Sequence, residues 1–234
     1  MAEGPQAVRE ALRYANVREV FVTEAASERH EDILRVAEST GVAVHVRSEA
    51  QLQSLSETVT PQGLVAVCDQ VATPFADTDL SGCRLVVVLV EARDPGNVGT
   101  IIRVADAAGA DAVVLTAGSV DPHNGKSVRA SAGSLFHLPV LTGLPIDGTA
   151  AALAGAGLQV LAADAAGVDL DDLDEALGHP TAWLFGNEAY GLPPGLVSAA
   201  DQVVAVPIHG KAESLNLATA AAVCLYASAR RQRR

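Results

Sequence analysis

The sequence predicts an α/β protein in two parts, a small α/β domain followed by a larger parallel sheet covered by helices. Apolar runs of strand length alternate with amphipathic stretches of helix length along most of the 234 residues. A polar segment with proline and glycine interrupts this alternation at 69–83. After it, the run LVVVLV at 85–90 is apolar throughout, as expected of a central parallel strand buried on both faces.

The first part, residues 1–68, alternates short helices and strands. We expect helices at 8–15, 28–39 and 49–54 and strands at 20–22, 42–46 and 63–67. The stretch 28–39 places Ile33 and Ala37 on one side, and Gly41 follows it where a helix C-terminal glycine belongs. A unit of this size is close to the smallest that forms its own core.

The second part, residues 84–234, has the longer elements. Strands are expected at 85–90, 112–115, 158–164, 182–185 and 203–206, and helices at 149–155, 171–177 and 214–230. Another helix is expected from Asn97, as its N-cap, to about Ala108, with Gly109 ending it. This order predicts a parallel sheet with helices on both sides.

The composition excludes several classes of protein. Hydrophobic residues make up 49% and charged residues 19%, so general disorder is excluded. No apolar run approaches the ~18 residues of a membrane helix, and the first residues lack the layout of a secretory signal. Three scattered cysteines, Cys68, Cys83 and Cys224, predict neither a zinc site nor a disulfide framework. We expect a cytoplasmic protein without metal.

The charge is acidic overall, with local basic groups. A net charge of −12 argues against a protein that coats nucleic acid through bulk charge. The candidate phosphate contacts are Lys126, Arg129 and Lys211 in loops, and Arg230, Arg231, Arg233 and Arg234 at the end of the chain. The alternative is that these are ordinary solvated charges.

Three loops with polar residues follow predicted strands. The first contains Asn97 and Arg103, the second contains Gly186 and Glu188, and the third contains Ser214 and Asn216. Since parallel sheets bind ligands at the carboxyl ends of their strands, these loops are candidates for one site. Taken singly, each also has an ordinary explanation: a solvated surface arginine, a glycine-rich turn, or a helix cap.

Common nucleotide and catalytic motifs are absent from the sequence. No G-x-G-x-x-G motif follows the first strand, and no glycine-rich run ends in the Gly-Lys-Ser/Thr of a P-loop. The six histidines lack metal-ligand spacing, and no cysteine or serine nucleophile can be paired with a histidine base.

Together, the three loops resemble the three motifs of the SpoU (TrmH-type) RNA ribose 2′-O-methyltransferases, in the SPOUT class. The motifs read DPGNVGTIIRVADAAGADAVVL, LFGNEAYGLP and VPIHGKAESLNLATAAAVCLYA, and their order matches across 84–230. The segments GPQAVREAL at 4–12 and PQGLVAV at 61–67 are similar to the family's small RNA substrate-binding domain, which resembles a ribosomal protein.

The resemblance implies a deep trefoil knot near the C-terminus, which binds S-adenosylmethionine. It also implies a homodimer whose active site is completed across the interface. No metal and no membrane are implied. Matching motif positions place the cofactor contacts at Gly186, Val206, Ile208, Ser214, Leu215 and Asn216.

The implied reaction is methyl transfer to a ribose 2′-hydroxyl of RNA, with 23S ribosomal RNA expected from the type of N-terminal domain. Arg103 matches the family's catalytic position, and we expect it to bind phosphate and stabilise the developing oxyanion, because its pKa above ~12 makes it a poor base. Asn97 and Glu188 would orient Arg103 or the ribose, and Ser214 and Asn216 would hold the loop and cofactor. A tRNA enzyme and an inactive RNA-binding protein remain alternatives.

Overall fold

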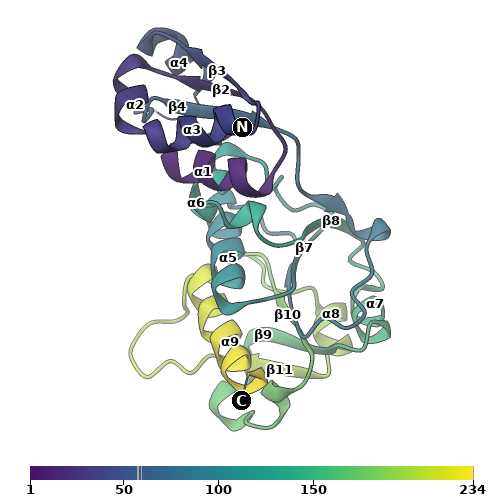
Figure 1. Ribbon diagram of the computed structural model, residues 1–234. Coiled ribbons are helices and arrows are strands. Elements are labelled where there is room, and N and C mark those ends of the chain that lie inside the picture. Colours follow the sequence, from purple (N-terminus) through teal and green to yellow (C-terminus); the bar gives the residue numbers. More distant parts are fainter. Residues whose placement is uncertain (57, 59, 234) are drawn as a thin grey trace.

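The computed structural model describes residues 1–56, 58 and 60–233, and it has two α/β parts joined end to end (Figure 1). The N-terminal part lies at one end of the molecule, beside α5 and α6, and the C-terminal helix α9 lies toward the other end. Both parts follow the alternation predicted from the sequence.

The N-terminal part is a four-stranded mixed sheet with helices. Its elements are β1 (Ala2–Glu3), α1 (Pro5–Tyr14), β2 (Val17–Val22), α2 (Glu24–Arg29), α3 (Glu31–Ser39), β3 (Ala43–Val46), α4 (Glu49–Leu55) and β4 (Leu64–Cys68). The strand order is β1-β4-β2-β3, with β2 and β3 parallel and the other pairs antiparallel. Val20 and Val22 of β2 pack with Val8 of α1 and Ile33 of α3 in its core.

The single helix expected at 28–39 is wrong, because the structure has two helices there. Thr23 caps α2 by accepting a hydrogen bond from the Ala26 N–H. His30 then leaves the helical conformation, with φ −127° and ψ 36°, and α3 starts after it. The residues just before α3, Glu28, Arg29 and His30, include no glycine or proline, so the sequence carried no signal of the break.

The larger sheet has seven strands, all parallel, in the order β11-β9-β10-β6-β7-β8-β5. The strands are β5 (Thr73–Pro74), β6 (Leu85–Leu89), β7 (Ala112–Thr116), β8 (Val140–Leu144), β9 (Gln159–Asp169), β10 (Thr181–Phe185) and β11 (Gln202–Ala205). Neither β5 nor β8 was predicted. The segment 69–83, expected to be a linker, therefore contributes an edge strand to this sheet, and Pro74 suits that edge because it donates no hydrogen bond.

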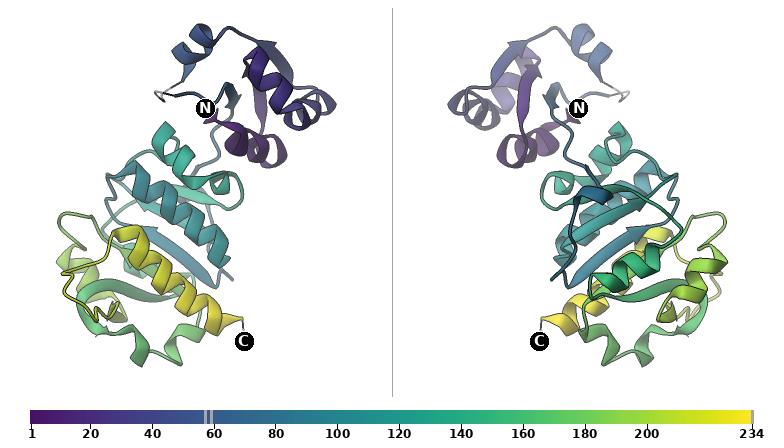
Figure 2. Two further views of the ribbon diagram at one scale, coloured as in Figure 1. Left: turned by 90° about the vertical axis from the view of Figure 1, so that its left-hand side faces the viewer. Right: turned by 90° about the vertical axis from the view of Figure 1, so that its right-hand side faces the viewer.

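Helices cover both faces of this sheet, as predicted (Figure 2). On one face lie α5 (Pro95–Ala108), α6 (Gly125–Ser131) and α9 (Leu217–Gln232), and on the other lie α7 (Thr149–Gly155) and α8 (Pro194–Ala199). Strand β6 serves both cores: Val87 and Leu89 pack on the first face, and Val86 and Val88 on the second. An all-apolar strand is what two covered faces require.

Two predicted helices differ in the structure: one is replaced by 3₁₀ turns, and the other begins later. The stretch 171–177 forms two 3₁₀ turns, η3 (Leu170–Asp172) and η4 (Ala176–Gly178), rather than a helix. The Asp169 side chain accepts a hydrogen bond from the Asp171 N–H and so favours a local turn. The last helix begins at Leu217 rather than at 214, because Asn216 is its N-cap.

Polar contacts join the two parts. Arg129 of α6 donates to Glu3 of β1 at 2.6 Å between Nη1 and Oε2. The ring nitrogens of His137 lie 2.8 Å from Asp106 of α5 and 3.3 Å from Glu10 of α1. The N-terminal part is thus attached directly to the helices that lie over the first face of the large sheet.

Two arginines near the end of the chain have partners within the larger part of the molecule. Arg231 pairs with Asp174, and Arg233 donates to the Ala108 carbonyl at 2.9 Å. Arg234 lies outside the described residues. In the described part of the chain, no helix has the length and apolar character needed to cross a bilayer.

Candidate active site

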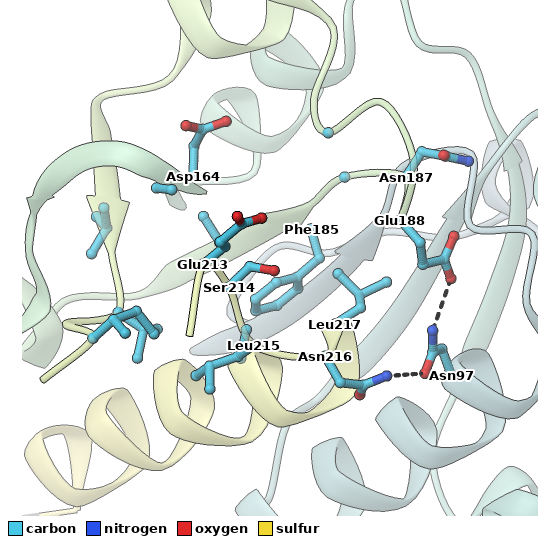
Figure 3. A pocket seen from close by; sticks show the side chains of 18 residues that line it. Asn97, Asp164, Phe185, Asn187, Glu188, Glu213, Ser214, Leu215, Asn216 and Leu217 are labelled. Carbon is cyan, nitrogen blue, oxygen red and sulfur yellow. Dashed lines mark hydrogen bonds between the residues drawn. The ribbon is translucent and has the colours of Figure 1, made fainter. Parts of the chain in front are cut away.

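A cavity of about 400 Å³ opens at the carboxyl ends of β9, β10 and β11, closed on one side by the loop that leads into α9 (Figure 3). The sequence-predicted residues that line it are Asn97, Gly186, Glu188, Val206, Ile208, Ser214, Leu215 and Asn216. Phe185 forms apolar wall on the strand side. The three loops singled out in the sequence therefore do meet at one place.

The turn after β10 is built for close backbone packing. A Cβ atom at Gly186 would overlap the backbone of Gly191 and Leu192. Asn187 and Gly191 exchange two backbone hydrogen bonds of 3.0 and 2.8 Å, which close the turn. The buried Asn187 side chain then donates to the Glu91 carbonyl at 2.7 Å and ties this turn to the end of β6.

Three side chains from the three loops form one hydrogen-bonded chain. The Oδ1 of Asn216 caps α9 by accepting from the N–H groups of Ala218 and Thr219. Its Nδ2 is thereby directed to the Oδ1 of Asn97, at 3.0 Å. The Nδ2 of Asn97 donates in turn to Oε1 of Glu188, at 3.1 Å (Figure 3).

The expectation that Asn97 caps its own helix is wrong. Helix α5 begins at Pro95, and Asp94 is the N-cap that accepts from the Asn97 N–H at 2.8 Å. The Asn97 side chain is therefore available for Glu188 and Asn216. The Asp-Pro pair at 94–95 is the signal that sequence analysis overlooked, since proline favours the first position of a helix.

Asp94 also forms an ion pair with Lys126, with 2.8 Å between Oδ2 and Nζ. The Lys126 ammonium, followed by the Asn97 N–H, holds the pKa of the Asp94 carboxyl below its ordinary value. The pair fixes the first turn of α5, where Asn97 lies. Lys126, predicted to contact RNA, thus has an intramolecular partner.

Asp94→Asn is expected to lower stability in a pH-dependent way. A carboxyl whose pKa is depressed in the folded state stabilises the fold above the unfolded pKa of ~3.9 and loses that contribution as pH falls through the folded pKa. The deficit of the variant in urea unfolding should be present at pH 7 and shrink below about pH 4. With 43% of the Asp94 side chain exposed, it should not exceed about 1 kcal/mol. A deficit that stays constant between pH 7 and pH 3 would contradict this assignment.

Arg103 is the predicted catalytic residue that the cavity does not include. It lies exposed on α5, about 9 Å along the helix axis from Asn97, and is not among the lining residues. Within the described part of the chain it makes no hydrogen bond or ion pair. Its guanidinium is thus available to a group that the described chain does not supply.

The lining is acidic, which sequence analysis did not detect. Asp164 within β9 and Glu213 in the loop before α9 join Glu188 around the cavity, and the described lining contains no lysine, arginine or histidine. Asp164 accepts from the Ala166 N–H at 2.9 Å. These carboxylates are far apart in the sequence, and that they meet is known only once the sheet order is known.

The loop before α9 also offers backbone hydrogen-bond donors to the cavity. The N–H groups of Ile208, Ser214 and Leu215 donate to no other described protein group, so they are left for water or a ligand. Lys211 is exposed in the same loop. Burial raises the pKa of the Cys224 thiol to about 12, which keeps it protonated. No group of three or more described His, Cys, Asp or Glu side chains could hold a metal ion.

Known proteins are similar to this chain over nearly its whole length. The model of the family described as "SpoU rRNA Methylase family" matches residues 84–226. The model described as "RNA 2′-O ribose methyltransferase substrate binding" matches residues 1–74. The 23S rRNA (guanosine(2553)-2′-O)-methyltransferase RlmP of Bacillus subtilis is 35% identical over 232 residues, covering 97% of this chain and 86% of that protein. The 23S rRNA (guanosine-2′-O-)-methyltransferase RlmB of Bordetella pertussis is 30% identical, covering 98% of this chain and 96% of its own.

A solved structure agrees with these relatives. The AdoMet-bound rRNA methyltransferase from Sinorhizobium meliloti superposes with a TM-score of 0.83 and 33% identity, covering 98% of this chain and 86% of that one. The similarity extends over both parts of the molecule. The chain therefore belongs to the SpoU rRNA methylase family and carries, ahead of the methylase domain, the family's substrate-binding domain.

Proposed function

We propose that this chain transfers a methyl group from S-adenosylmethionine to a ribose 2′-hydroxyl of 23S ribosomal RNA. The observation that carries the proposal is the hydrogen-bonded chain of Asn216, Asn97 and Glu188 at the mouth of the cavity. It joins the three motifs into one site, and the relatives named as 23S rRNA methyltransferases match over nearly the full chain.

The residues around the cavity fit the cofactor. The overlap that a Cβ at Gly186 would produce keeps the turn after β10 closely packed, and the unpaired N–H groups of Ile208 and Leu215 supply donors. Phe185 supplies an apolar surface, and the three carboxylates favour a cation over an anion. When bound, S-adenosylmethionine supplies an activated methyl group on a cationic sulfur.

The protein then has to align the ribose and stabilise its oxygen as the 2′-proton leaves. Glu188, oriented by Asn97, is positioned to accept a hydrogen bond from a ribose hydroxyl. Arg103 would bind the adjacent phosphate and stabilise the developing negative charge. Ser214 and Asn216 hold the loop before α9 in place.

We propose further that the enzyme is a homodimer in which Arg103 acts on the partner's cavity. The position of Arg103 on the exposed side of α5 supports this, since that side faces no described group of its own subunit. Helix α9 packs beside α5 and exposes Val223 and Tyr226, an apolar surface that a second subunit would cover. Tyr190, which is 88% exposed, either stacks on a base or packs in this interface.

A trefoil knot in the C-terminal part belongs to the same proposal. Its support is the strand order, in which β9 and β11 lie beyond β10 while the following helix α9 packs back against β6 and β10. Residues 1–68 would act as the RNA-binding domain and 84–234 as the methyltransferase domain. A ribosomal RNA substrate implies work in the cytoplasm.

The experiment that tests the function is a map of ribose methylation. Ribosomal and transfer RNA from cells with and without the gene are compared by mass spectrometry of nuclease fragments. We expect loss of one 2′-O-methyl group in 23S rRNA. Loss from a tRNA instead would contradict the assigned substrate. Calorimetry that detects no S-adenosylmethionine binding at any salt concentration would favour an inactive RNA-binding protein.

A further inference from the structure

We propose that Arg93 binds a backbone phosphate of the RNA beside the nucleotide that is methylated. The inference rests on the proposed function and adds a residue to it, since Arg93 lies outside the three groups of residues assigned above. It follows from how the turn between β6 and α5 is held and from which nearby cations are already paired.

The turn that carries Arg93 is held by hydrogen bonds to its main-chain groups from other segments. Glu91 has a positive φ of 48°, a conformation that non-glycine residues rarely adopt. Its N–H donates to Thr116 Oγ1 at 2.9 Å, and its carbonyl accepts from Asn187 at 2.7 Å. The Ala92 carbonyl accepts from the Val120 N–H at 2.9 Å.

The same turn brings Arg93 to the site. The Arg93 N–H lies 3.5 Å from Oε2 of Glu188, the carboxylate whose other oxygen accepts from Asn97. The main chain of Arg93 is therefore beside the group assigned to the ribose. A strained conformation held by several partners at such a place indicates a functional constraint.

The Arg93 side chain is presented to solvent rather than used in the fold. It is 70% exposed, and its nearest carboxylate is Glu91 Oε1 at 4.0 Å. An exposed ion pair at this distance contributes little to the stability of the fold. A phosphate can take the place of the Glu91 carboxylate and accept two parallel hydrogen bonds from the guanidinium.

Two nearby cations on α6, Lys126 and Arg129, are less available. Lys126 is paired with Asp94 at 2.8 Å, and Arg129 with Glu3 at 2.6 Å. The cavity is lined by carboxylates and the chain carries a net charge of −12, so an RNA backbone is repelled unless a local cation holds it. Arg93 supplies that cation at the edge of the site.

Arg93→Ala tests the inference, with Arg84→Ala as the matched control. Arg84 is an exposed arginine just before β6, at the opposite end of the strands from the cavity, and its guanidinium donates to the Gly178 carbonyl at 3.2 Å. Binding of a 23S rRNA fragment is measured by fluorescence anisotropy over a range of salt concentrations, and S-adenosylmethionine binding by calorimetry. We expect Arg93→Ala to weaken RNA binding about tenfold and to reduce the salt slope by about 0.7–1. The control should keep the wild-type slope, and both variants should bind the cofactor normally.

A second variant changes the sign of the effect. Glu91→Gln keeps the shape of the side chain and the backbone hydrogen bonds but removes the carboxylate that competes for Arg93. We expect tighter RNA binding than wild type, and a smaller tightening when Arg93→Ala is already present, because only the general repulsion between carboxylate and phosphate is then relieved. RNA affinity and salt slope unchanged in Arg93→Ala would overturn the inference. If wild type binds and methylates the fragment, that result leaves the proposed function standing.

Discussion

Replacing Arg103 with alanine is expected to abolish methyl transfer while S-adenosylmethionine still binds. Removing a donor that stabilises a developing oxyanion costs about 10²–10³ in rate, and the loss of the phosphate contact adds to it. Cofactor binding is unaffected because Arg103 does not line the cavity. Stability should change by less than about 0.5 kcal/mol, since the side chain is exposed on α5. Single-turnover assays and calorimetry measure the two properties separately.

A mixed dimer shows in which subunit Arg103 acts. One subunit carries Arg103→Ala with an intact cavity, and the other carries Gly186→Val with an intact arginine. If Arg103 acts across the interface, one of the two sites in the purified heterodimer works, whereas each homodimer is inactive. Activity absent from the heterodimer would contradict action in trans. Normal turnover by the Arg103→Ala homodimer would exclude this guanidinium from the reaction altogether.

Gly186→Ala is the second change with a large expected effect, here on cofactor binding. The added Cβ meets the backbone of Gly191 and Leu192, which cannot move aside as a flexible side chain would. The turn after β10 must shift, and with it Glu188 and the wall of the cavity. We expect the Kd for S-adenosylmethionine to rise at least about 100-fold, a loss of about 2.7 kcal/mol.

Gly195→Ala is the control for this substitution. Gly195 lies in α8, and nothing lies within 4 Å of a Cβ added there. This variant should bind the cofactor like wild type. Thermal denaturation of both variants separates a local change of the turn from general unfolding. Unaltered affinity in a folded Gly186→Ala protein would show that the close approach to Gly191 does not shape the site.

The predictable part of the fold came from long apolar runs. Strands β6, β7 and β10 were predicted from the runs LVVVLV, AVVL and AWLF, because a strand covered on both faces is apolar at every position. The strand β8 was missed because Thr142 and Gly143, the two positions that are not buried, break its apolar pattern. The two-residue β5 carries no pattern at all, since its role as an edge strand depends on pairing with β8.

The candidate site was predictable in its members but not in its contacts. The sequence placed Asn97, Glu188 and Asn216 after strands of one parallel sheet, so they were expected at one edge. It did not predict that they bond to one another, because 91 residues separate Asn97 from Glu188 and 119 separate Asn97 from Asn216. The ion pair of Asp94 with Lys126 and the hydrogen bond of Asn187 to Glu91 were missed for the same reason, since each joins distant segments.

By itself the sequence determined the two-part α/β organisation, five of the seven strands of the large sheet and the loops that converge on the cavity, because local periodicity and short motifs encode these features. Only the tertiary structure decided which amide meets which carboxylate, that Lys126 and Arg129 are already paired, and that Arg93 and Arg103 are left exposed. The physical reason is that hydrogen bonds and ion pairs need atoms within a few ångströms, and that proximity arises only when distant segments pack together.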